Sequence, residues 1–207
     1  MNRAGSRRKR SKGDLTSQAI LDTAEQLLET RALDDIAVDE LTSGAGISRS
    51  TFYFHFESRE AVLLALSERI TDSLYDSAVL WLRRGSEPPA DSIRRAIAGT
   101  VALWRAHGPV LRAAVRARDT SELVRGFWSG VARRFIESSA TQIEIEREAG
   151  VALPGPPTAR ALATVLISMN ESMCYRLSLS RKSAARDREV VDTLTAVWLR
   201  AVYGVPQ

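Results

Sequence analysis

The stretch "GAGISRSTFYFHFESREAVLLAL", residues 44–66, decides the fold of this chain. Its two glycines stand two residues apart and are followed by five aromatic rings at positions 52–56. Gly46 can adopt a positive φ without steric cost, which favours a tight turn. Ser48 and Ser58 are both typical of the residue that caps a helix N-terminus. The stretch therefore predicts a turn, a short helix and then a long apolar helix.

This order of elements predicts a helix-turn-helix, in which two short helices cross at a steep angle through a tight turn. Apolar side chains on both sides of the turn can face inward together, namely Val38, Leu41, Ala45, Ile47, Phe52 and Phe56. Hydroxyl side chains allow close approach to the major groove, and an arginine can bond a guanine edge or a phosphate. We expect the DNA contacts to come from Ser48, Arg49, Ser50, Thr51, Tyr53, His55 and Arg59. The alternative is that "TFYFHF" is only an aromatic core segment.

The charge distribution supports a DNA partner. The chain has 29 lysines and arginines against 25 acidic residues, for a net charge of +4. Residues 1–12 carry six positive charges and no negative one, whereas residues 13–62 carry three basic and ten acidic side chains. We expect residues 1–13 to form a disordered basic arm that reaches phosphates or the minor groove. The alternative is a tail that only keeps the protein in solution.

The rest of the chain predicts an all-α fold of about nine helices. Residues 14–60 would form the helix-turn-helix domain, and residues 61–207 a ligand-binding and dimerisation domain. Proline, glycine and serine predict loops at residues 85–92, 107–109, 151–158 and 180–187. A first helix is predicted from Leu15 onward, where Leu15, Ala19, Leu21, Ala24, Leu27 and Leu28 form one apolar face at helical spacing. Apolar residues recur every four positions in the long helix that follows Ser58, at Val62, Leu66, Ile70, Leu74 and Ala78. The segment "TQIEIEREAG" alternates like a strand, but its composition favours a helix that ends at a glycine.

Several other classes of protein are disfavoured. Cys174 is the single cysteine, so no internal disulfide forms, and a reducing, cytoplasmic location is expected. The N-terminus lacks the apolar segment of a secretory signal, and no apolar run approaches the ~20 residues of a membrane span. An enzyme using Cys174 with His55 or His107 is disfavoured, because a lone cysteine is usually a small core residue. No metal or phosphate motif is present, so no catalytic residue, metal or cofactor is predicted.

Residues 15–66 resemble the DNA-binding head of the TetR family of bacterial regulators. The resemblance rests on "GAGIS", "RSTFYFHF" and "SREAVLLAL", and it extends to one group of that family through "ARDTSELVRGFW", "LISMNES" and "AVWLRAVYG". Thr42, Ser50 and Arg59 depart from the commoner residues of the family at their positions. The resemblance implies a repressor that binds operator DNA as a homodimer. A small apolar ligand would release it by tilting the helix from Ser58 to about Leu82.

The resemblance also implies a homodimer built from the last two helices and a ligand pocket between the middle ones. Two apolar stripes agree with such a dimer: Leu162, Val165, Leu166, Met169, Met173 and Leu177, then Val190, Leu194, Val197, Trp198 and Ala201. We expect the ligand to contact Thr100, Trp104, Trp128, Phe135, Met169, Asn170, Met173 and Trp198. Core packing alone is the alternative for each ring. A regulator without a ligand, either an activator or a constitutive repressor, is the alternative for the whole chain.

Overall fold

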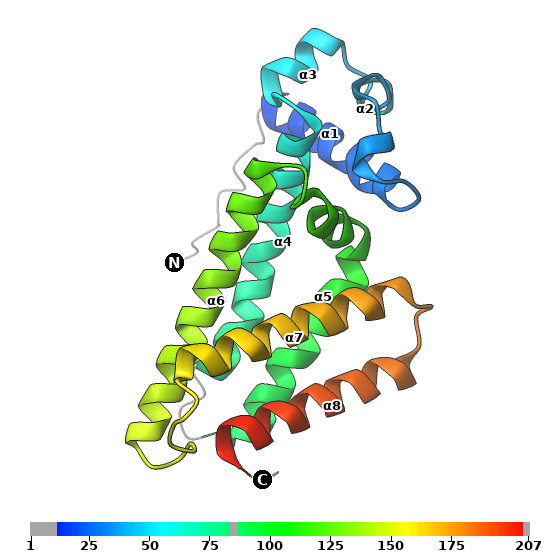
Figure 1. The fold of residues 1–207 in the computed structure, drawn as a ribbon. Coiled ribbons are helices and arrows are strands. Elements are labelled where there is room, and N and C mark those ends of the chain that lie inside the picture. Colours follow the sequence, from blue (N-terminus) through cyan, green and yellow to red (C-terminus); the bar gives the residue numbers. More distant parts are fainter. Residues whose placement is uncertain (1–11, 83–86, 205–207) are drawn as a thin grey trace, which may run out of the picture.

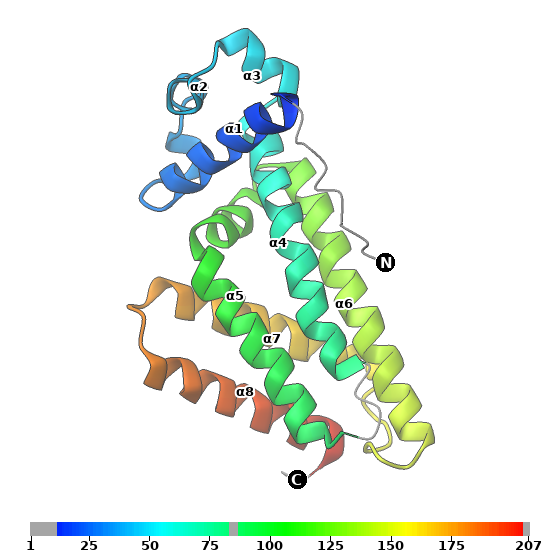
Figure 2. The same cartoon turned by 180° about the vertical axis from the view of Figure 1, so that it is seen from behind.

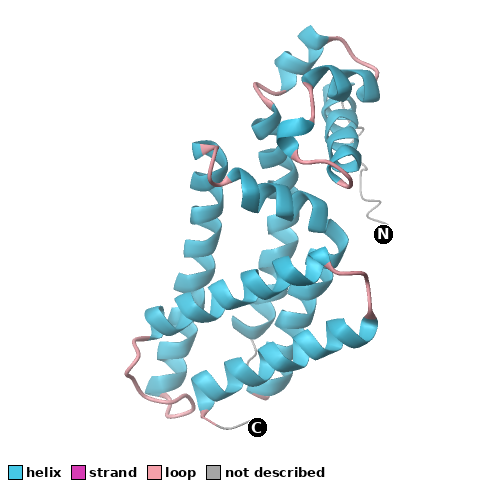
Figure 3. Cartoon of the chain, turned by 45° about the vertical axis from the view of Figure 1, so that its right-hand side comes forward, coloured by secondary structure: helices cyan, strands magenta, loops and turns pink. Residues whose placement is uncertain are grey.

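The fold is all-α, as predicted. The computed structural model describes residues 12–82 and 87–204, and every regular element in those ranges is a helix (Figures 1 and 3). The elements in chain order are α1 (Lys12–Leu28), η1 (Leu33–Asp35), α2 (Val38–Ala45), α3 (Arg49–His55), α4 (Arg59–Leu82), α5 (Pro89–Ala117), α6 (Glu122–Glu148), α7 (Ala159–Leu179) and α8 (Ala184–Tyr203). Eight α-helices and one 3₁₀ turn in the described ranges agree with the expected number of about nine.

The first three helices form a small head at the N-terminal end of α4 (Figure 1). The apolar core of the head includes Phe52 of α3, Ile20 of α1 and Leu41 of α2, and all three are fully buried. The buried face of α1 consists of Ile20, Leu21, Ala24 and Leu28. Leu15 was predicted to belong to this face, but it is exposed, since the buried stripe begins more than one turn further along α1.

The turn between α2 and α3 has the predicted geometry. Gly46 has a φ of 66°, the left-handed conformation that favours glycine. The N–H of Ile47 then donates to the carbonyl of Thr42 at 3.0 Å, which closes the end of α2. Ser48 caps α3 by accepting the N–H of Thr51 at 3.1 Å, and Ser58 caps α4 by accepting the N–H of Ala61 at 3.2 Å. Both predicted caps are confirmed.

The larger part of the molecule is built around α5. Helices α4 and α6 run side by side along one side of it, and α7 and α8 form an antiparallel pair that crosses it (Figures 1 and 2). The C-terminal core buries Val110, Ile143, Leu166, Leu194 and Trp198 among other residues. In α4 the predicted stripe is buried at Val62, Leu66 and Ile70. The side chains of Leu74 and Ala78, which complete that predicted stripe, lie outside the described set.

The predicted loop at residues 107–109 is wrong. The chain bends there inside α5, where His107 leaves helical geometry at φ −117° and ψ 22°. Pro109 causes a bend because it has no N–H to donate one turn back and its ring crowds that turn. Helix resumes at once on both sides, so the proline kinks the helix instead of ending it.

Three other predicted boundaries shift. Pro89 starts α5, and Ala184 starts α8, so the predicted loops at 85–92 and 180–187 are shorter than expected. Proline is favourable in the first turn of a helix, where its missing N–H is not needed. The predicted arm at residues 1–13 lies outside the described residues up to residue 11, and Lys12 already belongs to α1. The "TQIEIEREAG" segment is helical to Glu148, as predicted.

Candidate DNA-binding surface and ligand cavity

The outer face of α3 and its cap form a polar, exposed surface at the tip of the head. Ser48, Arg49, Ser50 and Tyr53 are exposed, whereas Phe52 between them is buried. The hydroxyl of Ser48 lies 2.9 Å from that of Ser50 and 2.8 Å from that of Thr51. Three hydroxyls therefore cluster at the start of α3, where short side chains allow close approach to a DNA backbone.

Arg49 is already paired in the unbound protein. Its guanidinium donates to Asp39 of α2 at 2.6 Å and to the Tyr53 hydroxyl at 3.4 Å, and it lies 5.7 Å from the centre of the Tyr53 ring. The contacts with Tyr53 and then with Asp39 raise the pKa of Arg49 above its usual range. All three side chains are exposed, so the pair can open when a phosphate or a base competes for the guanidinium.

Phe54 is a surface residue that the sequence pattern did not single out. Its ring is 84% exposed and stands edge-on to His55 with 5.3 Å between ring centres. Phe52 and Phe56 lie four residues apart and share the inward side of the segment, so Phe54 between them points away from the core. The helical period within "TFYFHF" is the signal that could have identified it.

Arg59 occupies a different environment from the other predicted DNA contacts. Its guanidinium donates to the carbonyls of Leu33, Asp34 and Ile36 at 3.2, 2.9 and 2.8 Å. These bonds hold the chain around η1 against the start of α4. DNA contact by Arg59 stays a prediction, but the residue has a clear structural role in the head.

A cavity of about 1040 Å³, a volume that includes the space at its mouth, lies between α5, α6, α7 and α8. Most of its wall is apolar and aromatic, which is typical of sites for small organic ligands. Its lining residues are Ile93, Ala96, Ile97, Thr100, Trp104, Leu111, Val115, Arg118, Trp128, Val131, Ala132, Phe135, Ser139, Ile167, Asn170, Glu171 and Trp198. Six of the eight predicted ligand contacts are among them. Met169 and Met173 are not, and both are partly buried against the apolar core instead.

Four polar side chains of the wall form two pairs. The Trp198 indole N–H donates to the Asn170 amide oxygen at 3.1 Å, which ties α8 to α7. Arg118 forms an ion pair of 2.6 Å with Glu171, and its guanidinium lies 5.3 Å from the centre of the Trp128 ring. Sequence reasoning missed Arg118 and Glu171 as cavity residues, because they are far apart in the chain and only the fold brings them together.

The cavity wall also reaches the long helix that carries the head. Phe135 of the wall lies against Tyr75 of α4, with 5.6 Å between ring centres. Arg134, the neighbour of Phe135 on α6, places its guanidinium 3.6 Å from the centre of the same Tyr75 ring. A change in the position of Phe135 therefore acts directly on α4.

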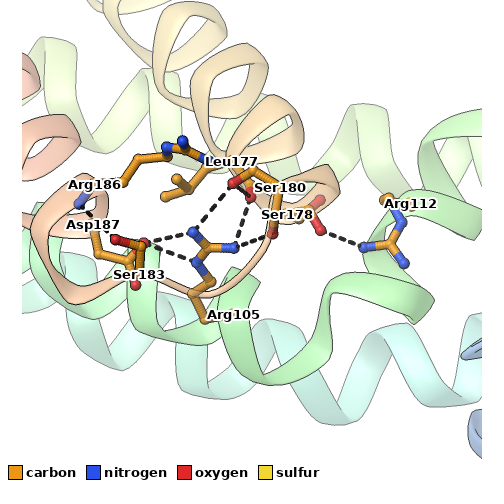
Figure 4. Close-up of polar contacts among 8 residues, drawn as sticks. All are labelled: Arg105, Arg112, Leu177, Ser178, Ser180, Ser183, Arg186 and Asp187. Atoms are coloured by element: carbon orange, nitrogen blue, oxygen red, sulfur yellow. Dashed lines mark hydrogen bonds and ion pairs between the residues drawn. The ribbon is translucent and has the colours of Figure 1, made fainter.

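Arg105, whose side chain is largely buried, fixes α5 to the junction of α7 and α8 (Figure 4). Arg105 donates to Asp187 at 2.6 and 2.9 Å and to the carbonyls of Leu177 and Ser180 at 2.8 and 2.9 Å. One helical turn beyond the kink, Arg112 donates to the carbonyl of Ser178 at 2.9 Å. These bonds close the C-terminal end of α7 and hold the start of α8 to α5.

The kink of α5 also contacts the head. His107 lies 3.3 Å from the carboxylate of Glu25 in α1. At Gly108 an added Cβ would come within 2.9 Å of Arg112 and 3.3 Å of Ser178, so a glycine permits the close approach of α5 to α7. The bend is thus the place where the head, the cavity helices and the α7–α8 pair meet.

The groups considered for an enzyme do not come together. His55 is in the head, His107 is at the kink of α5, and Cys174 is buried in α7. Burial raises the pKa of the Cys174 thiol to about 12, so the thiol stays protonated and unreactive at neutral pH. Across residues 12–82 and 87–204 no cluster of metal-binding side chains is found, and no helix there has the length and apolar character of a membrane span.

Comparison with known families agrees with this architecture. Residues 20–66 match a family described as "Bacterial regulatory proteins, tetR family", and residues 93–204 match "Transcriptional regulator EthR, C-terminal domain". The chain belongs to the TetR family. It is a transcriptional regulator with a helix-turn-helix DNA-binding domain, and its family is one of regulators and not of enzymes.

The EthR proteins of mycobacteria are among the relatives of this TetR-family chain. The "HTH-type transcriptional regulator EthR" of Mycobacterium tuberculosis H37Rv is 40% identical over 211 residues, covering 97% of this chain and 93% of that protein. EthR of Mycolicibacterium smegmatis is also 40% identical, over 206 residues that cover 97% and 92% of the two chains. The predicted resemblance to the TetR family, and within it to EthR, is confirmed.

Solved structures share the fold at lower sequence identity. A TetR-family regulator from Rhodococcus RHA1 has a TM-score of 0.74 at 16% identity, covering 96% of this chain and 100% of that chain. Another from Streptomyces coelicolor has a TM-score of 0.70 at 20% identity, covering 90% and 79% of the two chains. At these identities the likeness concerns the fold alone.

Proposed function

We propose that this protein is a repressor that binds operator DNA as a homodimer and is released by a small, mostly apolar ligand. The connection between two surfaces carries the proposal. The exposed face of α3 stands on the N-terminal end of α4, and Tyr75 further along α4 contacts Phe135 in the cavity wall. Movement of one helix thus couples a ligand site to a DNA-contact surface.

The DNA contacts are assigned to the face of α3 and its cap. Ser48, Ser50 and Thr51 supply hydroxyls that suit phosphate contacts at the entry of α3 into the major groove. Arg49 is the first residue of α3, Tyr53 lies about one turn further on, and His55 ends the helix. Phe54 adds an exposed apolar ring, which suits contact with a thymine methyl group.

The dimer is assigned to the outward faces of α7 and α8. Val165 on α7 is 65% exposed, and the exposed positions near it on the same face are small: Ala161, Ser168 and Ser172. Small side chains allow the corresponding helices of two subunits to approach closely. In such a dimer the two α3 helices would have to lie about 34 Å apart to enter successive major grooves on one face of the duplex.

Release of the dimer from DNA requires that the ligand bind one arrangement of the dimer more tightly than the other. A ligand shifts the equilibrium only if it binds the form with the wrong spacing of heads more tightly than the form that fits DNA. Filling the cavity beside Phe135 would displace Tyr75 and tilt α4, and the heads would move with it. The Glu25–His107 contact gives the kink of α5 a second route to the same head.

The test is a titration of fluorescent DNA from the gene's own upstream region, followed by anisotropy at two salt concentrations. The wild type should bind this DNA far more tightly than a scrambled duplex, and the log–log salt slope should be near −0.9 for each phosphate contact. Arg49→Ala should lower operator affinity about 10- to 100-fold. Arg133→Ala removes the same charge from an exposed position on α6 and serves as the matched control.

Three outcomes would contradict the proposal in different parts. Equal binding of operator and scrambled DNA by the wild type would remove the recognition role of α3. If Arg49→Ala and Arg133→Ala lowered operator affinity equally, the effect would come from the loss of positive charge and not from a specific contact of Arg49. If no compound in a library of apolar molecules changed operator binding or thermal stability, the chain would be a regulator without a ligand.

A further inference from the structure

A second cleft, separate from the ligand cavity, lies between the head and the C-terminal half of α5. Its volume is about 830 Å³, which includes the space at its mouth. The head contributes residues 28–34, from the end of α1 into η1. The other wall consists of Pro109, Arg112, Ala113, Arg116 and Ala117 of α5, with Leu179 at the end of α7. None of these residues lines the ligand cavity, so the two sites are distinct.

Arg112 is half-buried in this cleft and lacks a carboxylate partner among the described residues. Its guanidinium donates to the carbonyl of Ser178 at 2.9 Å (Figure 4). A charge held inside a protein is unfavourable unless an opposite charge compensates it. The other half-buried arginines of the described ranges all form an ion pair with a carboxylate: Arg31 with Glu40, Arg59 with Glu60, Arg105 with Asp187, Arg118 with Glu171 and Arg147 with Glu144.

Arg116 adds a second positive charge one turn further along α5. Residues four apart lie on the same face of a helix, and both arginines line the cleft. Arg116 is exposed, and it too has no carboxylate partner in the described part of the chain. Burial and then the charge of Arg116 lower the pKa of Arg112. One wall of the cleft therefore carries two neighbouring guanidiniums without a counter-ion.

The acidic residues of the head do not neutralise this pair. Glu29 and Asp34 line the opposite wall, and both are exposed to water. Neither lies within ion-pair distance of Arg112 or Arg116. Arg31 on the same wall is already held by Glu40. The counter-ion that would compensate Arg112 is therefore missing from a cleft that has room for a small molecule.

We propose that this cleft binds a small molecule with a terminal oxyanion, a carboxylate or a phosphate, which Arg112 and Arg116 hold between the head and α5. The N–H donors of a guanidinium form a planar fork that matches both kinds of oxyanion. The apolar side chains of Leu28, Leu33 and Ala113 in the same cleft suit a short hydrocarbon body beside the charged group.

This site goes beyond the proposed release of the repressor, because it uses a different cleft and selects for charge. A molecule bound there contacts the head and α5 together, so it holds the head in one position on the larger part of the molecule. A conformational effect on DNA binding follows if the two positions of the head differ in affinity for the operator.

Three probes on one ring test the charge selection: benzoate, benzamide and phenyl phosphate. Benzamide has nearly the shape of benzoate but no charge, and phenyl phosphate presents the other kind of oxyanion. Calorimetry on the full-length protein at low ionic strength gives the dissociation constants, since salt screens accessible charges. The wild type should bind at least one of the anions about tenfold more tightly than benzamide. The tighter of the two identifies a carboxylate or a phosphate as the preferred group.

Two variants place the binding in the cleft. Arg112→Gln should lower the preference for the anion over benzamide about tenfold, because it removes the half-buried donor fork. Arg116→Gln should lower it about threefold and leave folding unchanged, since its side chain is exposed, so it keeps the test valid if Arg112→Gln is poorly folded. Arg133→Gln is the matched control, because Arg133 is an exposed arginine of α6 that does not line the cleft.

A preference that falls in both cleft variants and holds in Arg133→Gln supports the oxyanion site. Equal binding of benzamide and both anions by the wild type would overturn it, and Glu29 or Asp34 would then serve these arginines in solution. An equal loss in all three variants would also overturn it, since net charge alone would explain the binding. These outcomes concern the second cleft only, so the failure of this site would leave the proposed release mechanism intact.

Operator titrations test whether the cleft controls the position of the head. A saturating concentration of the tighter anion should change the operator affinity of the wild type about threefold relative to benzamide at the same ionic strength. The change should disappear in Arg116→Gln. An unchanged affinity in the wild type, or a change that persists in Arg116→Gln, would exclude control through the cleft, because competition of the anion with DNA does not require Arg116.

Discussion

The head and the cavity differ in how far apart in the sequence their determining residues lie. In the head a compact local sequence determines both the core and the surface, because the helical period of α3 places Phe52 on its inward side and Arg49, Tyr53 and Phe54 on exposed positions. In the cavity each polar contact joins distant parts of the chain, as in the Arg118–Glu171 ion pair and the Trp198–Asn170 bond. The head can therefore change its DNA contacts without repacking, whereas a change in the cavity affects three or four helices together.

The sharpest test of this contrast in the head uses two phenylalanines that are two residues apart. Phe52 is fully buried and Phe54 is 84% exposed. Phe52→Ala should destabilise the protein by about 3–5 kcal/mol, since it removes a large core side chain and leaves a cavity. Phe54→Ala should change the free energy of unfolding by less than about 0.5 kcal/mol, as expected of a surface site. Urea unfolding followed by circular dichroism measures both.

The same pair separates folding from DNA binding. Phe54→Ala should lower operator affinity about tenfold while its unfolding curve matches the wild type. Loss of stability in Phe54→Ala would mean that the ring packs within the protein in solution. Unchanged operator affinity in that variant would exclude Phe54 from the DNA surface.

The next largest effect is expected at the anchor between α5 and the α7–α8 junction. Arg105 and Arg94 both lie on α5 and both pair with an aspartate of α8, Asp187 and Asp192 respectively. The side chain of Arg105 is 10% exposed and also bonds two carbonyls, whereas that of Arg94 is 51% exposed. Arg105→Met should cost about 2–4 kcal/mol, since it leaves a carboxylate and two carbonyls without their donor.

Arg94→Met is the control for this anchor. An exposed pair contributes about 0–1 kcal/mol, so this variant should unfold close to the wild type. Thermal and urea unfolding of the two variants should therefore differ clearly. Similar losses in both would show that the buried bonds of Arg105 add nothing beyond its ion pair.

The head could be predicted from the sequence because its determinants are local. Gly46, the cap Ser48 and the inward spacing of Phe52 and Phe56 lie within eleven residues, and each has a direct physical consequence for the backbone. The error at Leu15 arose where a helix starts, since an apolar residue in the first turn can satisfy the period without reaching the core. Arg59 was assigned to DNA by position, although its guanidinium bonds three carbonyls of the head.

The cavity could be predicted only in outline. Aromatic residues on the middle helices indicated a pocket, and Trp104, Trp128, Phe135 and Trp198 do line it. Which face of α7 it uses could not be deduced, because Met169 and Asn170 are neighbours that differ by about 100° around the helix. The pairing of Arg118 with Glu171 depends on how α5 and α6 cross α7. No local signal in the sequence determines that crossing.

A smaller effect is expected where the two regions meet, at Tyr75. Its ring contacts Phe135 of the cavity wall and the guanidinium of Arg134. Tyr75→Leu should weaken the effect of ligand on operator affinity about three- to tenfold. The substitution removes the aromatic contact with Phe135 through which a displaced cavity wall would move α4. Operator titrations with and without a saturating ligand measure the coupling.

Ligand affinity separates this coupling from simple damage to the cavity. The dissociation constant of the ligand should change little in Tyr75→Leu, since Tyr75 is not among the residues that line the cavity. An unchanged coupling factor would mean that the signal reaches the head by the kink of α5 and its His107–Glu25 contact instead.

The smallest effect concerns the pairing of Arg49 in the unbound head. Asp39 holds the guanidinium at 2.6 Å, so the arginine must exchange a carboxylate for a phosphate or a base when DNA binds. Asp39→Asn removes that competitor and its negative charge from the exposed surface of the head. Operator affinity should rise about two- to fivefold at low salt, and the gain should vanish at high salt because exposed charges are screened. Asp34→Asn makes the same change of charge on η1 of the head, so an equal gain there would assign the effect to net charge.

A loss of operator affinity in Asp39→Asn, with binding to scrambled DNA unchanged, would mean that Asp39 positions Arg49 for recognition. The head would then depend on a contact between α2 and α3, as the cavity depends on contacts between its helices.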